Sequence, residues 1–207
     1  MYARSTTIAA QSSSIDSGIA YLRDEAMSTM PELEGWVGLS LLVDRASGRC
    51  IATSAWESEA AMHDSRGRVQ AVRSGLAQAL NGQIDLVQEW EIAVMHRDQL
   101  SSDGACTRCT WVQAGPGEID RLIDMFKMSV LPEAEMMDGF CSSSLFVDRA
   151  TDRAVGAMVW ANRESLDNSR EQANRIRTAA MQKAGASVLE VAEFELGFAH
   201  LRVPEMA

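Results

Sequence analysis

The sequence predicts an α+β fold built from two tandem copies of one β-α-β-β-α-β unit. The segment 43–49 (VDRASGR) recurs as 147–153 (VDRATDR), which places the second copy 104 positions after the first (148 − 44). At this offset, without any gap, 23 of the 103 overlapping pairs are identical, against roughly seven expected from ordinary amino-acid usage. The halves therefore share a common origin, and equivalent residues are expected 104 positions apart.

Each half begins with a short segment rich in Thr, Ile, Val or Trp that predicts a first strand, at residues 3–11 and 107–114. Turn-forming residues follow both segments. Apolar side chains then recur at three- and four-residue spacing and predict a first helix in each half: Ile15, Ile19, Leu22, Ala26 and Met27, and Ile119, Leu122, Ile123, Phe126 and Val130.

A hairpin of two strands is predicted next. Gly35 and Gly139 mark the entry to the second strand of each half, and the polar repeat segment forms the tight turn of the hairpin. The third strand ends at Trp56 in the first half and at Trp160 in the second.

A second helix follows that hairpin in each half. Ser58 and Asn162 stand where a side-chain oxygen can cap its first amides, and Gly82 and Gly185 end it. A fourth strand with alternating apolar and polar residues completes the unit.

This element order is typical of a ferredoxin-like fold, with four antiparallel strands covered on one face by two helices. The other sheet face would stay bare, so we expect the two sheets to close against each other as a barrel. The predicted division is 1–97 for the first unit, 98–104 for a polar linker and 105–207 for the second unit.

Composition and charge exclude several classes of partner. The net charge of −10 opposes the binding of nucleic acid or anionic lipid. No signal peptide and no run of about 18 apolar residues is recognisable, which favours a cytoplasmic protein without a membrane segment.

Four cysteines, Cys50, Cys106, Cys109 and Cys141, are expected as reduced thiols. Cys106 and Cys109 have the spacing of metal ligands, but positions three apart on a strand point to opposite faces, which disfavours zinc.

Two short segments of the first half resemble those of a known protein family. Gly35-Trp36 opens the second strand, and Trp56-Glu57-Ser58-Glu59-Ala60 joins the third strand to the second helix. These features resemble the antibiotic-biosynthesis-monooxygenase family of dimeric α/β barrels, and this chain looks like a covalent version of that dimer. The resemblance implies cofactor-free oxygenation of aromatic molecules, haem degradation, or binding without catalysis.

The haem-degrading branch of that family uses an Asn, a Trp and a His that are not retained here. The matching positions fall near Thr7, Ser65 and Ser74 in the first half, and near Trp111, Ser169 and Thr178 in the second. We therefore expect no haem, and the scattered Ser, Cys and His residues likewise predict no flavin or metal cofactor.

His63 and Arg66, on the second helix of the first half, are the candidate catalytic residues. His63 has no counterpart in the second half, where Asp167 stands, so the fold does not require it. It is a candidate proton acceptor, although a lone helix histidine is more often an exposed or capping side chain. Arg66 and Arg73 share one helix face and could hold an oxygen anion, or could equally pair with acidic residues.

Arg4 and Arg108 are expected to form cross-strand ion pairs inside the barrel with the glutamates of the fourth strands, Glu89, Glu91, Glu193 and Glu195. His96 and His200 are duplicated, which favours a structural role, and Trp56 and Trp160 are expected as core anchors.

Thr7, Ser54, Trp56 and Arg73 are the candidate ligand-pocket residues. Trp111 and Met158 replace Thr7 and Ser54 in the second half, so we expect only the first half to keep an open pocket.

Two functions remain open at this point. One is cofactor-independent oxygenation, or related catalysis, on a small aromatic or hydrophobic molecule. No nucleophile with an adjacent base is recognisable, so the substrate of such an enzyme would have to supply its own reactivity toward oxygen. The other is non-catalytic binding of such a molecule or a stress-related role. The sequence leaves further pairing into a homodimer open.

Overall fold

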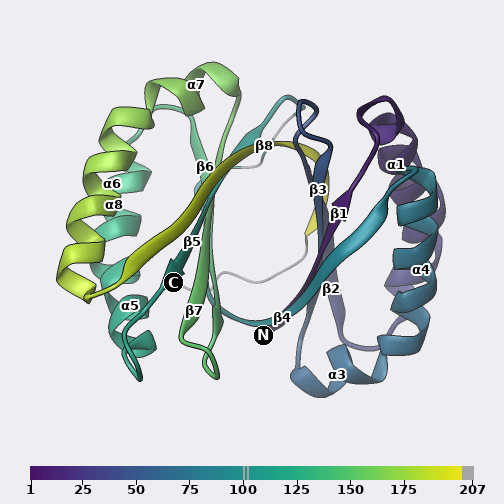
Figure 1. Ribbon diagram of the computed structural model, residues 1–207, viewed down its shortest axis with the longest axis horizontal. Coiled ribbons are helices and arrows are strands. Elements are labelled where there is room, and N and C mark those ends of the chain that lie inside the picture. Colours follow the sequence, from purple (N-terminus) through teal and green to yellow (C-terminus); the bar gives the residue numbers. More distant parts are fainter. Residues whose placement is uncertain (100, 102, 202–207) are drawn as a thin grey trace. The chain divides into compact units, whose positions relative to one another are not determined.

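The computed structural model describes residues 1–99, 101 and 103–201. Its elements follow the predicted order twice (Figure 1). The first half contains β1 (Tyr2–Ala9), η1 (Ser12–Ser14), α1 (Ile15–Tyr21), η2 (Leu22–Ala26), α2 (Met27–Thr29), η3 (Met30–Glu32), β2 (Trp36–Val43), β3 (Arg49–Trp56), α3 (Glu59–Asp64), α4 (Arg66–Ala79) and β4 (Gln83–Arg97). The second half contains β5 (Cys106–Gln113), α5 (Ile119–Met125), η4 (Phe126–Val130), α6 (Leu131–Glu135), β6 (Phe140–Asp148), β7 (Arg153–Trp160), α7 (Arg163–Asn168), α8 (Arg170–Ala184) and β8 (Ser187–Leu201).

The strands hydrogen-bond in the order β1-β3-β2-β8-β5-β7-β6-β4 and close into a barrel. The hairpins of the two halves are antiparallel in equivalent registers, with Leu41 opposite Ala52 and Leu145 opposite Gly156. This arrangement confirms the predicted α+β fold of two tandem ferredoxin-like units.

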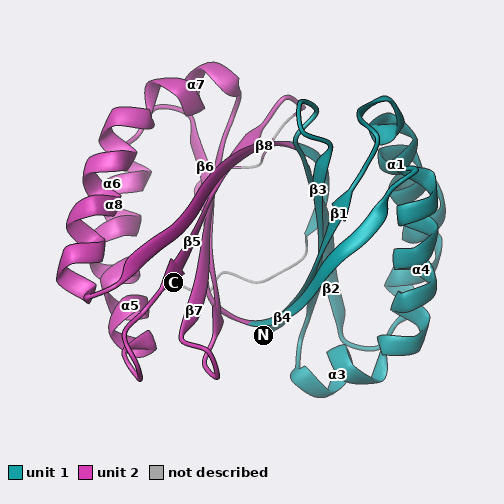
Figure 2. Cartoon of the chain, viewed as in Figure 1, with its two compact units in different colours: residues 1–90, 196–203 teal, residues 91–195, 204–207 magenta. Residues whose placement is uncertain are grey.

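Contacts between residues divide the chain into two compact units (Figure 2). Unit 1 contains Met1–Trp90 together with the end of β8 from Leu196, and unit 2 contains Glu91–Glu195. The long strands β4 and β8 are therefore each divided between the units. The boundary of the repeat at 98–104 stays a prediction, and positions 100 and 102 of that linker lie outside the described residues.

Helix caps and left-handed turns explain why the elements begin and end where they do. The side chain of Ser58 accepts a hydrogen bond from the amide of Ala61, and Asn162 accepts one from Ser165, as predicted. Gly35 and Gly139 have φ angles of 70° and 73°, values that glycine adopts without steric cost.

Each predicted first helix contains a π-helical turn, at equivalent positions in the two halves: η2 and η4. The predicted strands also end one or two residues early, because β1 ends at Ala9 and β5 at Gln113. No helix in the described part of the chain is both long and apolar enough to cross a bilayer.

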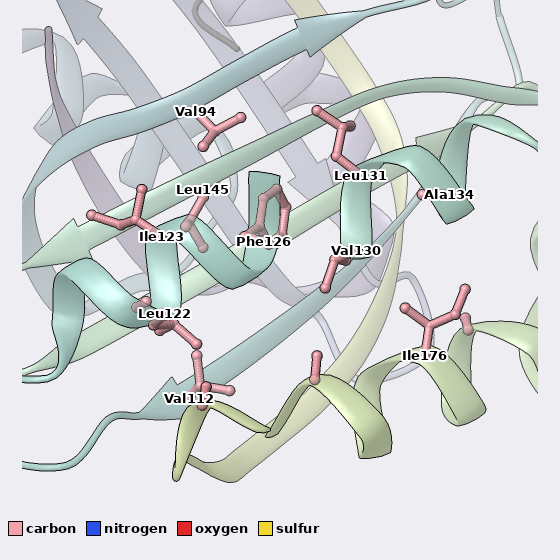
Figure 3. Packing of buried hydrophobic residues seen from close by; sticks show 14 of the residues in the cluster. Val94, Val112, Leu122, Ile123, Phe126, Val130, Leu131, Ala134, Leu145 and Ile176 are labelled. Carbon is pink, nitrogen blue, oxygen red and sulfur yellow. The ribbon is translucent and has the colours of Figure 1, made fainter. Parts of the chain in front are cut away.

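Each unit has its own hydrophobic core between its helices and one face of its strands. In unit 2, apolar side chains from α5, η4, α6 and α8 point toward those of the strands (Figure 3). Trp56 and Trp160 are fully buried in these cores, which confirms their predicted role as anchors.

Candidate functional site

A buried arginine lies on the helix-covered face of the sheet in unit 1. Arg4 of β1 is 2% exposed and forms an ion pair with Glu89 of β4 at 2.8 Å between Nη2 and Oε1. The same Nη2 donates a hydrogen bond to the carbonyl oxygen of Met62 in α3. The predicted cross-strand ion pair is therefore present, but the expectation that it lies inside the barrel was wrong, because Arg4 contacts helix α3.

Unit 2 repeats this arrangement with more hydrogen bonds. Arg108 of β5 donates from Nε and Nη2 to Glu193, from Nη1 to the Ser169 hydroxyl, and from Nη2 to the carbonyl oxygen of Leu166. Its guanidinium carbon also lies 5.1 Å from the ring centroid of Trp160. Every guanidinium nitrogen of Arg108 thus has a partner, whereas Nη1 of Arg4 has none.

Glu89 contacts both residues that were predicted to be catalytic. Its Oε2 lies 3.1 Å from Nε2 of His63, and its Oε1 accepts a hydrogen bond of 3.3 Å from Arg66. Burial raises the pKa of Glu89, but the hydrogen bonds and charge of Arg4, with further hydrogen bonds from His63 and Arg66, outweigh burial and hold it below its ordinary value. The side chains of His63 and Arg66 are both partly exposed, so this cluster lies at the surface of unit 1.

The lowered pKa of Glu89 predicts acid-sensitive stability. A carboxylate with a depressed folded-state pKa stabilises the protein above its unfolded pKa of about 4.3, and that contribution is lost as the pH falls through the folded value. Glu89→Gln should lower the urea midpoint at pH 7 and flatten its decline between pH 5 and 3. The matched control is Glu57→Gln, at an exposed position, and equal acid dependence in wild type and Glu89→Gln would contradict the prediction.

The two tryptophans that end β3 and β7 differ in one hydrogen bond. Nε1 of Trp56 donates to the Ser54 hydroxyl at 3.1 Å. Nε1 of Trp160 is buried and has no partner, because the residue equivalent to Ser54 is Met158. An apolar thioether thus replaces a hydroxyl acceptor in unit 2.

A cavity between sheet and helices is present in each unit. The cavity in unit 1 has a volume of about 30 Å³, and that in unit 2 about 70 Å³. The unit 2 cavity is lined almost entirely by apolar side chains, several of which are labelled in Figure 3. Its polar lining residues are Arg108, Thr110, Trp160 and Arg177.

Four smaller side chains account for the larger cavity in unit 2. Ala134, Gly156, Ala173 and Ala180 stand at the positions of Met30, Ala52, Val69 and Leu76, and all eight residues line the cavities. The prediction that only the first half keeps an open pocket was therefore wrong about which half is more open. Trp111 does not line the unit 2 cavity, since neighbouring positions on β5, Thr110 and Val112, point into it instead.

Arg73 and Arg177 line the cavities from equivalent positions on α4 and α8. Burial lowers the pKa of both side chains. The charge of Arg4 adds to this effect at Arg73, as that of Arg108 does at Arg177, and Glu89 opposes it at Arg73 alone. Among the described residues, Arg177 has no carboxylate partner and forms a hydrogen bond only with the neutral side chain of Asn174.

The predicted site residues of the first half fall into three groups. Ser54 and Arg73 line the unit 1 cavity, and His63 and Arg66 surround Glu89 at the surface. Thr7 and Trp56 do not line that cavity, so their assignment as pocket residues is corrected.

Thr6 lines the unit 1 cavity in place of Thr7. The signal that could have found it is strand parity, because Arg4 and Thr6 share one face of β1.

The two duplicated histidines have different surroundings. Nε2 of His96 lies 2.8 Å from Oε1 of Glu135, and its ring stacks on Phe140, whereas His200 stacks on Trp36 at 5.6 Å between ring centroids. The four cysteines are buried free thiols. Within the described ranges no group of three or more His, Cys, Asp or Glu residues could hold a metal ion.

A wider hollow of about 370 Å³ lies on the surface of unit 1 beside the start of α3. Exposed polar side chains supply much of its lining, among them Glu34, Glu57 and Asp64. Such a lining holds water, so the apolar cavity of unit 2 is the stronger candidate for a ligand site.

No known protein-family profile matches the chain. It is 50% identical over 206 residues to the uncharacterized protein Rv2557 of Mycobacterium tuberculosis H37Rv, an alignment that covers 100% of this chain and 92% of that protein. The uncharacterized protein Rv2558 of the same strain is 49% identical over 207 residues, with 100% and 87% covered. The chain belongs to the family of these two mycobacterial proteins.

Several solved structures are similar to this chain in their fold. A proposed monooxygenase, FN1347 of Fusobacterium nucleatum, superposes with a TM-score of 0.71 at 14% identity, covering 97% of this chain and 94% of that one. An anthrone oxidase-like protein gives 0.65 at 12% identity, with 100% and 95% covered. A Listeria monocytogenes ferredoxin-fold protein related to antibiotic biosynthesis monooxygenases gives 0.53 at 11%, with 95% of each chain covered. The resemblance to that barrel family is thereby confirmed for the fold.

Proposed function

We propose that this protein binds a small aromatic molecule carrying an anionic oxygen in the cavity of unit 2. The ligand class is a carboxylate or phenolate on an apolar ring. The apolar lining would bury the ring, and Arg177 would hold the anion.

One observation carries this proposal. Arg177 is a half-buried cation on the wall of an apolar cavity, and it has no carboxylate partner among the described residues. Burial disfavours its charged form, and the neighbouring charge of Arg108 disfavours it further. An anionic ligand would relieve both effects. Arg108 itself already forms an ion pair with Glu193.

The size of the cavity limits the ligand to a small one. A volume of about 70 Å³ is below the ~150 Å³ of an engineered apolar cavity that binds benzene. Met137, Met158 and Met181 line the cavity, and the unbranched methionine side chain rearranges readily. A single ring is therefore the appropriate probe.

Binding of benzoate tests the proposal. Wild-type protein should bind one benzoate per chain and bind the neutral benzamide more weakly, as measured by calorimetric titration. Arg177→Met should weaken benzoate binding about 10- to 100-fold, the effect of losing one charge-assisted hydrogen bond.

Arg175 offers a matched control for this variant. It lies on the same helix, is 71% exposed and does not line the cavity. Arg175→Met should bind benzoate as the wild type does. Equal affinities of wild type and Arg177→Met, or of benzoate and benzamide, would refute the proposed site.

Cofactor-independent oxygenation is the second candidate function, and the His63–Glu89 pair favours it. Glu89 contacts a histidine that could accept a proton, and it also pairs with Arg4, which lines the unit 1 cavity together with Ser54 and Arg73. A single-ring phenol reacts with O₂ at its para carbon to give a p-quinone and one water. The ring supplies all four electrons that reduce O₂, so no external reductant is needed.

Oxygen uptake with phenol distinguishes the two functions. An oxygenase should consume one O₂ per phenol and lose this activity in His63→Ala, whereas a binding protein should leave the background oxidation rate unchanged. Asp64→Ala, at the exposed neighbouring position, is the control for helix α3.

A further inference from the structure

We infer that the indole N–H of Trp160 recognises a second oxygen of the ligand, so that the ligand of unit 2 carries a carbonyl group as well as an anionic oxygen. This inference rests on the proposed function. It assigns a specificity-determining role to a residue whose sequence pattern indicated only a core anchor.

The indole of Trp160 is a buried donor without an acceptor. The residue is 0% exposed, and Nε1 has no hydrogen-bond partner. Its counterpart in unit 1 shows how such an indole is ordinarily satisfied, since Nε1 of Trp56 donates to Ser54. Met158 removes that acceptor in unit 2, and both Met158 and Trp160 line the cavity.

Leaving this donor unpaired is costly unless a ligand supplies the acceptor. A buried polar group without a partner loses its hydration and gains nothing in return. The guanidinium of Arg108 over the ring withdraws electron density and makes the N–H a stronger donor. A carbonyl oxygen is the matching acceptor, because it accepts a hydrogen bond and loses little hydration energy compared with a second carboxylate.

Two polar groups of the cavity then divide the recognition. Arg177 selects a negative charge, and Trp160 selects a neutral oxygen acceptor, while Arg108 is paired with Glu193 and most of the remaining wall is apolar. Unit 1 lacks this combination, since the hydroxyl of Ser54 already accepts the hydrogen bond of the Trp56 indole. The preferred ligands are therefore small aromatic keto acids or hydroxy ketones, bound in unit 2.

Two pairs of nearly isosteric probes test the inference: 3- and 4-acetylbenzoate, each compared with its isopropenyl analogue. Only the acetyl group carries an oxygen acceptor. In the wild type we expect at least one acetyl compound to bind about tenfold more tightly than its analogue, the effect of one hydrogen bond to a buried donor. The indole ¹H–¹⁵N signal of Trp160 should shift downfield with the acetyl compound alone.

Three variants isolate the donor. Trp160→Phe keeps an aromatic ring but lacks the N–H, and Met158→Ser offers Trp160 the acceptor that Trp56 has, so both should abolish the acetyl preference. Trp36→Phe is the control, because Trp36 also has a buried Nε1 without a partner but lies in unit 1, outside the cavity. It should retain the preference.

The outcomes separate this inference from the proposed function. If both members of each pair bind the wild type equally, or if Trp160→Phe keeps the preference, the role of Trp160 is refuted while anion binding stands. If neither member binds, and benzoate does not bind either, the proposed function fails and the inference fails with it.

Discussion

Arg108→Met should destabilise the protein by about 3–5 kcal/mol, the loss typical of breaking a buried ion pair by removing one partner. Arg108 is 4% exposed, and its guanidinium joins β5 to Glu193 on β8 and to the end of α7. Methionine fills a similar volume but donates no hydrogen bonds. Glu193, the Leu166 carbonyl and the Ser169 hydroxyl would all lose a donor. Urea denaturation at pH 7 measures this loss.

Arg4 provides the matched comparison for Arg108 in unit 1. Its Nη1 has no partner, and Glu89 is 34% exposed whereas Glu193 is 15% exposed. Water can therefore replace more of what Arg4→Met removes, so that variant should lose clearly less stability than Arg108→Met. An equal or greater loss from Arg4→Met would show that the additional hydrogen bonds in unit 2 do not contribute as described.

Trp56→Ala and Trp160→Ala should each cost about 3–5 kcal/mol, because each removes a fully buried indole from the core of its unit. The phenylalanine variants should differ from each other. Trp56→Phe breaks the hydrogen bond to Ser54, whereas Trp160→Phe breaks none and removes an unpaired buried donor.

We expect Trp56→Phe to cost about 1 kcal/mol more than Trp160→Phe in urea denaturation. Ser54→Ala is the control, because it removes the same hydrogen bond from the acceptor side. In a Ser54→Ala background the additional cost of Trp56→Phe should disappear. A larger loss for Trp160→Phe than for Trp56→Phe would indicate that Nε1 of Trp160 has a partner in the folded protein.

Local features of the chain were well predicted from the sequence. Ser58 and Asn162 cap helices as expected, and Gly35 and Gly139 stand at the entry to the second strand of each half, where both adopt positive φ angles. These outcomes depend on interactions between residues a few positions apart, which the order of residues specifies directly. The pairing of Arg4 with Glu89 was also predictable, because the element order alone makes β1 a neighbour of β4.

The candidate site was predicted less well, because its residues depend on side-chain direction. An error of one position on a strand exchanges the two faces of the sheet, and choosing Thr7 instead of Thr6 was such an error. The same error attributed to Trp111 a cavity that it does not line. His63 and Arg66 meet at Glu89, which comes from a strand distant in sequence, whereas helix spacing grouped Arg66 with Arg73, which lines the cavity instead.

By itself, the sequence determined that this protein is a duplicated β-α-β-β-α-β chain, because periodic apolar positions, caps and an ungapped repeat are all local or internal properties. Only the tertiary structure decided where a ligand could bind. The volume of a cavity depends on facing side chains from several elements, and four small residues on α6, β7 and α8 open the one in unit 2. None of these substitutions changes the hydrophobic pattern, so their combined effect appears only when the elements are packed together.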